Sequence, residues 1–167
     1  RIEKRARPKR NTKVCVGCKP CSITTGFAGA GAFSDGKLSL SPDVGGNLPE
    51  ILGYDRTIEL LKESDDIYLK FGADEKVYGI DEEEEIASIR KKAIQANLKL
   101  IECPIRHLGT EEGYKIYSRL QEHLLNEGVD MIFDTMVKDI IIEDGVAKGV
   151  VTDKGETYTA DEIVAAV

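Results

Sequence analysis

Residues 29–38 read GAGAFSDGKL, and this stretch comes close to two nucleotide-binding signatures. Residues 29–34 lack only the last glycine of the dinucleotide fingerprint G-x-G-x-x-G, because Ser34 stands in its place. Residues 31–38 lack only the Ser or Thr that ends a phosphate-binding loop, because Leu38 stands there. Each signature needs a particular architecture around it, so the flanking sequence decides whether either applies.

The flanking sequence fits neither signature. A phosphate-binding loop runs directly into a helix, whereas residues 39–46 (SLSPDVGG) contain Pro42 and a double glycine, which disfavour a helix. The dinucleotide fingerprint needs a strand, a tight turn and a helix within about thirty residues, and the sequence around residue 29 shows no such unit. Six of the sixteen glycines lie between residues 26 and 46 without any regular periodicity. We therefore expect a loop whose backbone takes conformations closed to other residues.

The composition indicates a globular protein of one domain, or of one domain with a small appendage. The 167 residues are 41% apolar and 32% charged, which suffices for a hydrophobic core. No run approaches the ~18 apolar residues of a membrane span, and no amino-terminal leader is visible, so we expect a cytoplasmic protein. The net charge is -7, yet residues 1–21 carry eight Lys or Arg and one acid. Such an arm either binds nucleic acid or is a solvated end.

Periodic apolar residues predict three amphipathic helices. The first is expected to begin at Asp55 and to end at Gly72, the second to be capped by Asp81, and the third to run over residues 110–128. The acids at residues 82–85 fall at the positive end of the second helix dipole, so they indicate a helix start rather than a metal site.

Strands are predicted between and after these helices. Residues 77–80 and 98–105 are extended, and residues 163–167 (IVAAV) form an apolar run suited to a buried strand. Turn signals at Asp144-Gly145 and Lys154-Gly155 predict a β-meander. Its strand-like segments are residues 129–133, 137–142, 146–152 and 157–159. His107 and His123 have no local partner pattern, so we expect surface or structural roles for both.

Three of the four cysteines lie within seven residues, a pattern that suits a reducing compartment better than a disulfide framework. Cys15, Cys18 and Cys21 can converge on one soft metal, and Cys103, which precedes a proline, is a candidate fourth ligand. Zinc and an iron-sulfur cluster are both compatible with this pattern. A thiol-redox role and purely structural cysteines are the alternatives.

The cysteine run at residues 15–21, the segment GFAGAGAFSDGKLSLSPDVGG at residues 26–46 and TADEIVAAV at residues 159–167 resemble a family of FAD-dependent oxidoreductases described as NAD(FAD)-utilising dehydrogenases. The resemblance covers essentially the whole chain. It implies a fold of α/β to α+β class, as part of a Rossmann-like, glutathione-reductase-type flavoprotein. Members begin with a βαβ unit that carries G-x-G-x-x-G, which is absent here, so the resemblance implies a central fragment of a longer flavoprotein.

The resemblance divides the chain into three parts. Residues 1–46 would hold the basic arm, the cysteine cluster and the glycine-rich FAD loop. Residues 47–106 fall where related flavoproteins place a helical cap or substrate segment, and residues 107–167 would supply a helix and the terminal β-meander of the FAD-binding domain. No acid, base or nucleophile stands out as catalytic, which is typical where the flavin carries the chemistry.

The resemblance also implies which residues contact the cofactor. The loop residues along FAD would be Gly29, Gly31, Ser34, Asp35, Gly36 and Lys37. Val137, at the start of the meander, would contact adenine through its backbone. FAD is the expected cofactor, NAD(P)H a candidate electron donor, and a small molecule the expected substrate. Neither a membrane nor nucleic acid is expected as a partner.

A zinc-binding nucleic-acid module is the alternative hypothesis. In it the basic arm and the cysteine cluster of residues 1–21 would grip nucleic acid, with the acidic remainder as a scaffold. Such a module has no use for the GAGAFSDGKL loop, and this loop therefore favours the flavoprotein interpretation.

Overall fold

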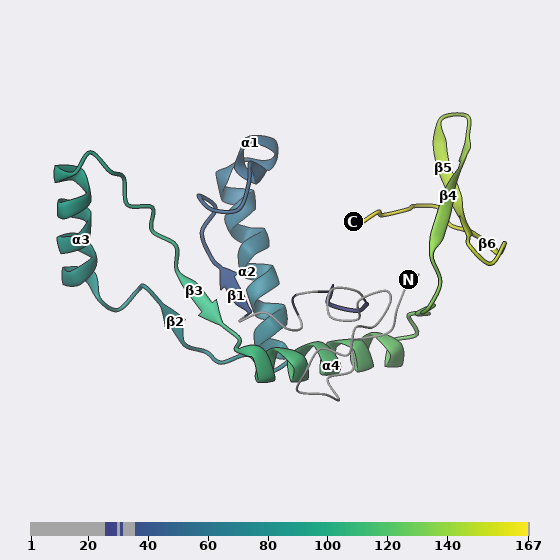
Figure 1. Cartoon of the computed structure of the whole chain (residues 1–167), viewed down its shortest axis with the longest axis horizontal. Coiled ribbons are helices and arrows are strands. Elements are labelled where there is room, and N and C mark those ends of the chain that lie inside the picture. Colours follow the sequence, from purple (N-terminus) through teal and green to yellow (C-terminus); the bar gives the residue numbers. More distant parts are fainter. Residues whose placement is uncertain (1–25, 30, 32–35, 167) are drawn as a thin grey trace, which may run out of the picture. The chain divides into compact units, whose positions relative to one another are not determined.

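The computed structural model describes residues 26–29, 31 and 36–166, which divide between two compact units. One unit comprises residues 31–120, and the other comprises residues 1–30 and 121–167. Both contain helix and antiparallel sheet, in agreement with the expected α/β to α+β class (Figure 1). The division of the chain into three functional parts stays a prediction.

The unit of residues 31–120 holds a small antiparallel sheet and several helices. Its strands are β1 (Lys37–Ser39), β2 (Val77–Tyr78) and β3 (Ile105–His107), in the order β1-β3-β2. Its helices are α1 (Leu48–Leu52), α2 (Tyr54–Lys70), α3 (Glu83–Gln95) and the first part of α4 (Thr110–Asn126). Because β3 is the central strand, its three residues fix the register of both neighbours.

The predicted helices are present, with one wrong cap. α2 begins one residue before the expected Asp55, and Gly72 follows it with a φ of 97°. α4 begins at the expected residue, and Gly128, with a φ of 84°, follows its end. The prediction of Asp81 as the cap of α3 was wrong, because Glu82 holds that position without a side-chain hydrogen bond. The acids next to it do lie in the first turn, where the helix dipole favours them.

Two expectations about extended structure need correction in this unit. The strand predicted over residues 98–105 is wrong for residues 98–104, since only the last residue enters β3. Leu98 is 66% exposed, and Pro104 has no N–H to donate, so neither packing nor hydrogen bonding favours a strand there. The glycine-rich segment is not wholly irregular, because Lys37–Ser39 pairs with β3 as β1.

The second unit contains the predicted β-meander. β4 (Val137–Glu143), β5 (Val146–Thr152) and β6 (Thr157–Thr159) form an antiparallel sheet in that order. Asp144 and Gly145 have φ values of 51° and 79°, and two positive φ values at the centre of a two-residue hairpin are the signature of a type I′ turn. The second turn closes through a 3.0 Å hydrogen bond from the Gly155 N–H to the Thr152 carbonyl.

Two strands predicted in this unit are not formed. Residues 129–133 contain only a single bridging residue, Ile132, and residues 163–166 are irregular with Val164 89% exposed. An apolar run becomes a strand only where a neighbouring strand supplies hydrogen-bond partners for its backbone. Among the described residues, 163–166 pair with no strand.

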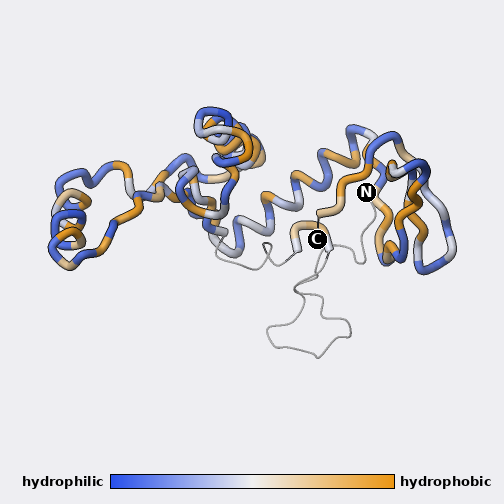
Figure 2. The backbone as a smooth tube through the Cα atoms, turned by 90° about the horizontal axis from the view of Figure 1, so that it is seen from above, coloured by the Kyte–Doolittle hydropathy of each residue, from blue (hydrophilic) through white to orange (hydrophobic). Residues whose placement is uncertain are grey.

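The described core is small and partly polar. Leu108 and Ile116 are 6% and 1% exposed, and buried beside them in the same unit are Thr57 and Arg106. Hydrophobic and hydrophilic residues alternate along the helices (Figure 2), as amphipathic periodicity requires. None of the helices in the described ranges is long and apolar enough to cross a bilayer.

We expect Gly149→Ala to destabilise the meander. A Cβ at this position of β5 would lie 2.5 Å from the Tyr158 carbonyl oxygen and 3.2 Å from Ile141 Cδ1. Because a backbone atom blocks the added methyl group, we expect the free energy of unfolding to fall by about 1–3 kcal/mol. Urea denaturation measures it. Lys148→Ala, an exposed neighbour on the same strand, is the control and should change stability by less than about 0.5 kcal/mol.

Candidate functional site

A buried ion pair joins the central strand to α2. Side chains alternate along β3, so Arg106 lies on one face of the sheet and its two strand neighbours on the other. Arg106 is only 4% exposed and Asp65 of α2 only 13%. The guanidinium donates from Nε to Asp65 Oδ1 at 2.5 Å and from Nη2 to Asp65 Oδ2 at 2.7 Å. Its Nη1 donates to the Asp74 carbonyl at 2.5 Å, so one side chain connects three segments.

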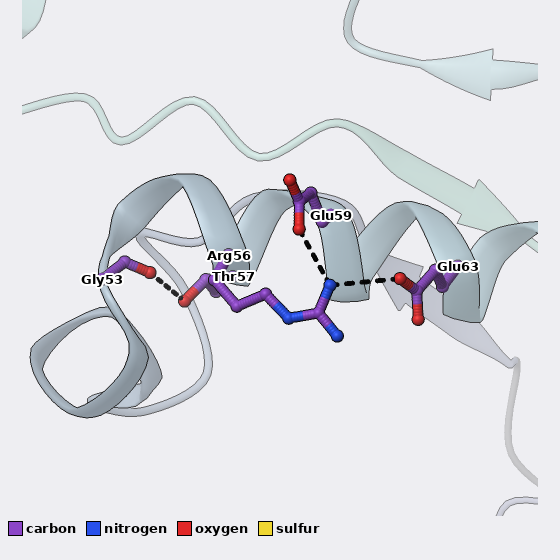
Figure 3. Close-up of polar contacts among 5 residues, drawn as sticks. All are labelled: Gly53, Arg56, Thr57, Glu59 and Glu63. Carbon is purple, nitrogen blue, oxygen red and sulfur yellow. Dashed lines mark hydrogen bonds and ion pairs between the residues drawn. The ribbon is translucent and has the colours of Figure 1, made fainter.

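The bidentate geometry sets the electrostatics of this contact. The hydrogen bonds that Arg106 donates to Asp65 raise the pKa of Arg106 above its ordinary value, and burial opposes this only in part. Two parallel N–H to carboxylate bonds are the strongest arrangement available to an arginine. Arg56 on the same helix shows the contrast, because it pairs with Glu59 and Glu63 at the surface (Figure 3). Of these two contacts, only the Arg106 pair joins the sheet to a helix.

The glycine-rich segment is held against the residues that follow β3. The Leu108 N–H donates to the Gly36 carbonyl at 2.9 Å, directly before β1 begins. Gly36 has a φ of 62°, and a Cβ there would lie 2.9 Å from Leu108 Cβ. Both the backbone conformation and the contact therefore require glycine at this position.

A second glycine of the segment packs against a tyrosine of α4. A Cβ at Gly31 would lie 3.3 Å from the Tyr117 hydroxyl oxygen. This hydroxyl lies 3.4 Å from that of Tyr68 on α2, and the two rings meet edge to face with centroids 6.0 Å apart. Tyr117, held by Tyr68, thus forms the wall against which Gly31 lies.

Tyr117 is held as a neutral phenol. Burial raises the pKa of Tyr117 well above its ordinary value of 10, and the hydrogen bond with Tyr68 raises it further. A hydroxyl that stays protonated can both donate and accept a hydrogen bond. It therefore supports the loop without adding a negative charge.

The structure describes five of the predicted cofactor residues and divides them between the two units. Gly31, Gly36 and Lys37 belong to one unit, in which Lys37 opens β1 opposite His107 of β3. Gly29 and Val137 belong to the other unit. There Gly29 closes a turn by donating to the Gly26 carbonyl at 2.9 Å, and Val137 begins β4 with 41% exposure. Ser34 and Asp35 lie outside the described residues.

The predicted metal ligands are mostly outside the described part of the chain. Cys15, Cys18 and Cys21 fall there, while Cys103 is half-buried with its Sγ 3.9 Å from the Pro104 carbonyl oxygen. Within the ranges that the structure describes, no three His, Cys, Asp or Glu side chains gather as metal ligands, and this includes the acids at the start of α3. The zinc or iron-sulfur site therefore stays a prediction.

Sequence reasoning missed the ion pair and the tyrosine wall, although the sequence carries a signal for the first. Asp65 falls on the apolar stripe of α2, between Leu61 and Tyr68 at helical spacing. Arg106 directly follows the strand predicted over residues 98–105, between Ile105 and His107. A charged residue on an apolar stripe and an opposite charge beside a predicted strand together indicate a buried pair. Tyr117 gives no comparable signal, because aromatic residues on an amphipathic helix are ordinary core residues.

The carboxyl-terminal half of the chain matches a known family. The family model described as "Pyridine nucleotide-disulphide oxidoreductase" matches residues 84–167, which is half of the chain. The match covers nearly all of α3, all of α4 and the meander, whereas the glycine-rich segment lies before it. No curated protein matches the chain.

We expect Asp65→Asn to be strongly destabilising. It leaves the Arg106 charge buried without a counter-charge, which costs about 3–5 kcal/mol. Urea unfolding measures the loss, and the double variant Asp65→Leu with Arg106→Met should recover much of it. Arg56→Met, which removes an exposed pair, is the control and should leave the unfolding midpoint unchanged. A small effect of Asp65→Asn would show that the pair does not anchor the sheet.

We expect alkaline pH to weaken the fold through Tyr117. Because the folded state raises the pKa of Tyr117, the unfolded chain loses this proton first, near pH 10. The stabilising effect is present below pH 10 and is lost as the pH rises towards the folded pKa. Unfolding curves between pH 8 and 11 should show a shallower decline for Tyr117→Phe than for the wild type. Tyr54→Phe, at a position that is 51% exposed, should keep the wild-type slope.

Proposed function

Because the chain belongs to the pyridine nucleotide-disulphide oxidoreductase family, we propose that it is part of an FAD-dependent oxidoreductase in which the glycine-rich segment of residues 29–37 lines the cofactor. Family membership carries the oxidoreductase assignment. The sequence of the loop supports FAD as the cofactor, since GAGAFSDGKL resembles flavin-dependent dehydrogenases. NAD(P)H is the proposed electron donor.

The described residues fit a cofactor that lies along a bare backbone. Gly36 combines a positive φ with close packing on Leu108, so its backbone is fixed and carries no side chain. At Gly31 a Cβ would lie 3.3 Å from the Tyr117 hydroxyl oxygen, so this backbone also packs closely on a neighbour. A bulky cofactor can approach such a backbone closely, and this is a recurring use of glycine beside nucleotides. We assign the loop residues named above, with Lys37 acting through its backbone, to the FAD surface and Val137 to adenine.

FAD supplies hydride or electron transfer when it is bound. The residues of this chain would position it. Arg106 and Asp65 hold β3 in place, β1 pairs with β3, and β1 carries the glycine-rich loop at its start. Tyr117 supports the loop as an uncharged hydroxyl. Gly31 and Gly36, held by these contacts, would present a preformed part of the surface, which lowers the ordering cost of binding.

The zinc-binding nucleic-acid module remains the competing hypothesis for residues 1–21. Family membership favours the oxidoreductase, because a zinc module does not account for the match over residues 84–167. Measuring zinc, iron and FAD in the purified protein separates the two. A zinc-containing protein that binds nucleic acid and takes up no FAD would support the module instead.

We expect the full-length protein to bind FAD and to lose affinity when Gly36 is changed. Gly36→Ala forces a Cβ to within 2.9 Å of Leu108 Cβ, so the loop must shift, and we expect FAD affinity to fall at least about tenfold. Flavin fluorescence titration measures it. Gly45→Ala is the matched control, because Gly45 also has a positive φ, 101°, but has no atom within 4 Å of the added Cβ.

The two glycine variants are compared only after circular dichroism shows that both are folded. Gly45→Ala should retain close to wild-type affinity for FAD. A colourless full-length protein that fails to take up added FAD would exclude the proposal. Equal losses of affinity in the two variants would show that backbone strain, rather than the position of the loop, controls binding.

A further inference from the structure

We propose that the face of the β1-β3-β2 sheet opposite Arg106 binds a small organic carboxylate with a flat apolar body. This face carries a hollow of about 210 Å³, lined by Lys37, Tyr78, Ile105 and His107. These residues come from all three strands of the sheet. The hollow lies within the unit of residues 31–120, and none of its four lining residues belongs to the ion pair on the other face of the sheet.

The register of the sheet explains why the four side chains share one face. Lys37 is the cross-strand partner of His107, and Tyr78 is the partner of Ile105. Directly opposed residues in antiparallel strands point to the same side, and residues two apart on one strand do so as well. Arg106, between Ile105 and His107, points to the opposite side and is buried there. The Arg106–Asp65 ion pair and the hollow thus lie on opposite faces of β3.

The hollow has two chemically different ends. The surface of the hollow is almost wholly apolar, so the cross-strand pair Lys37 and His107 lines it chiefly with carbon atoms, and their ammonium and imidazole groups lie beside it, where both can donate to a carboxylate. The other pair, Ile105 with Tyr78, supplies an aliphatic side chain and an aromatic ring. The Tyr78 ring also has Lys76 Nζ 4.5 Å from its centroid, which places a further positive charge beside the hollow. A ligand with a negative end and a flat apolar end matches this order.

The cationic end is available to a ligand. Among the residues that the structure describes, neither Lys37 nor His107 takes part in an ion pair or a side-chain hydrogen bond, and both are exposed. The other end offers apolar surface, since Ile105 is half-buried and Tyr78 is 49% exposed. In a chain with a net charge of -7, a cationic patch over apolar side chains favours an anion that also has an apolar part.

The volume limits the size of the ligand. The 210 Å³ of the hollow equals the share of about seven water molecules in the liquid, at ~30 Å³ each. It is below the ~300 Å³ at which pockets for drug-sized ligands begin. A single ring with one carboxylate fits this volume, whereas a whole dinucleotide does not. That such a carboxylate is a substrate of the flavin reaction rests on the proposed function. The binding of a carboxylate to the hollow does not rest on it.

Titration of the flavin-free, full-length protein with benzoate tests the proposal by NMR. We expect saturable shifts confined to the three strands. Benzamide has the same shape without the charge, and inorganic phosphate has charge without a ring, so both should bind several-fold more weakly. Equal binding of benzoate and benzamide would overturn the role of the cationic end. Phosphate binding as tight as benzoate binding would overturn the role of the apolar end.

Lys37→Met identifies the residue responsible, because it keeps the aliphatic stem and removes the charge. We expect benzoate affinity to fall about fivefold, the upper range for one partly exposed ion pair. Lys91→Met, at an exposed site on α3, is the matched control and should bind as the wild type does. Unchanged affinity in Lys37→Met would overturn the proposal.

The same preparations separate this proposal from the proposed function. Benzoate binding without FAD uptake would contradict the flavoprotein assignment and leave the carboxylate site standing. FAD uptake without benzoate binding would support the flavoprotein assignment and contradict the carboxylate site. Tyr78→Leu serves as a second variant, since it removes the ring from the apolar end and should weaken benzoate more than phosphate.

Discussion

The bidentate contact between Arg106 and Asp65 is the constraint on which the described sheet depends. β3 has only three residues, and its short ladders to β1 and β2 supply few hydrogen bonds. The guanidinium joins this strand to α2 and to the segment around Asp74 in a nearly dry environment. Buried ion pairs seldom increase stability over a well-packed apolar alternative. Here three directional hydrogen bonds from one guanidinium connect the strand, the helix and the Asp74 carbonyl.

The fixed position of β3 determines what lies on either side of it. Leu108, two residues after Arg106, holds Gly36 by a backbone hydrogen bond, and β1 follows directly. The carboxyl-terminal end of the glycine-rich segment is therefore held at a defined point, as the proposed cofactor surface requires. On the opposite face the same strand presents Ile105 and His107 to the hollow. Because side chains alternate along β3, Arg106 points to the ion pair with Asp65, while its neighbours Ile105 and His107 point to the proposed ligand site.

Elements with local causes were predicted well. α2 and α4 follow from apolar periodicity and glycine stops, and the hairpin at Asp144-Gly145 follows from the positive φ values that this dipeptide tolerates. The wrong strand predictions concern residues 98–104, 129–133 and 163–166, where an apolar pattern is present but no strand forms. A strand at these positions needs a partner strand from a distant part of the sequence. The pattern of apolar residues in a single sequence does not identify that partner strand.

The candidate site likewise has features that follow from the local sequence and features that depend on distant contacts. The sequence by itself determined that Gly36 belongs to a glycine-rich loop, because residue type alone limits backbone conformation, and it placed the meander and its turns through local periodicity. Only the tertiary structure decided that Tyr117 supports the loop, that Asp65 neutralises Arg106, and that Lys37 and His107 share one face. These pairs are separated by tens of residues in the chain. Their contacts depend on strand register and helix packing, which arise from the whole fold rather than from any local segment.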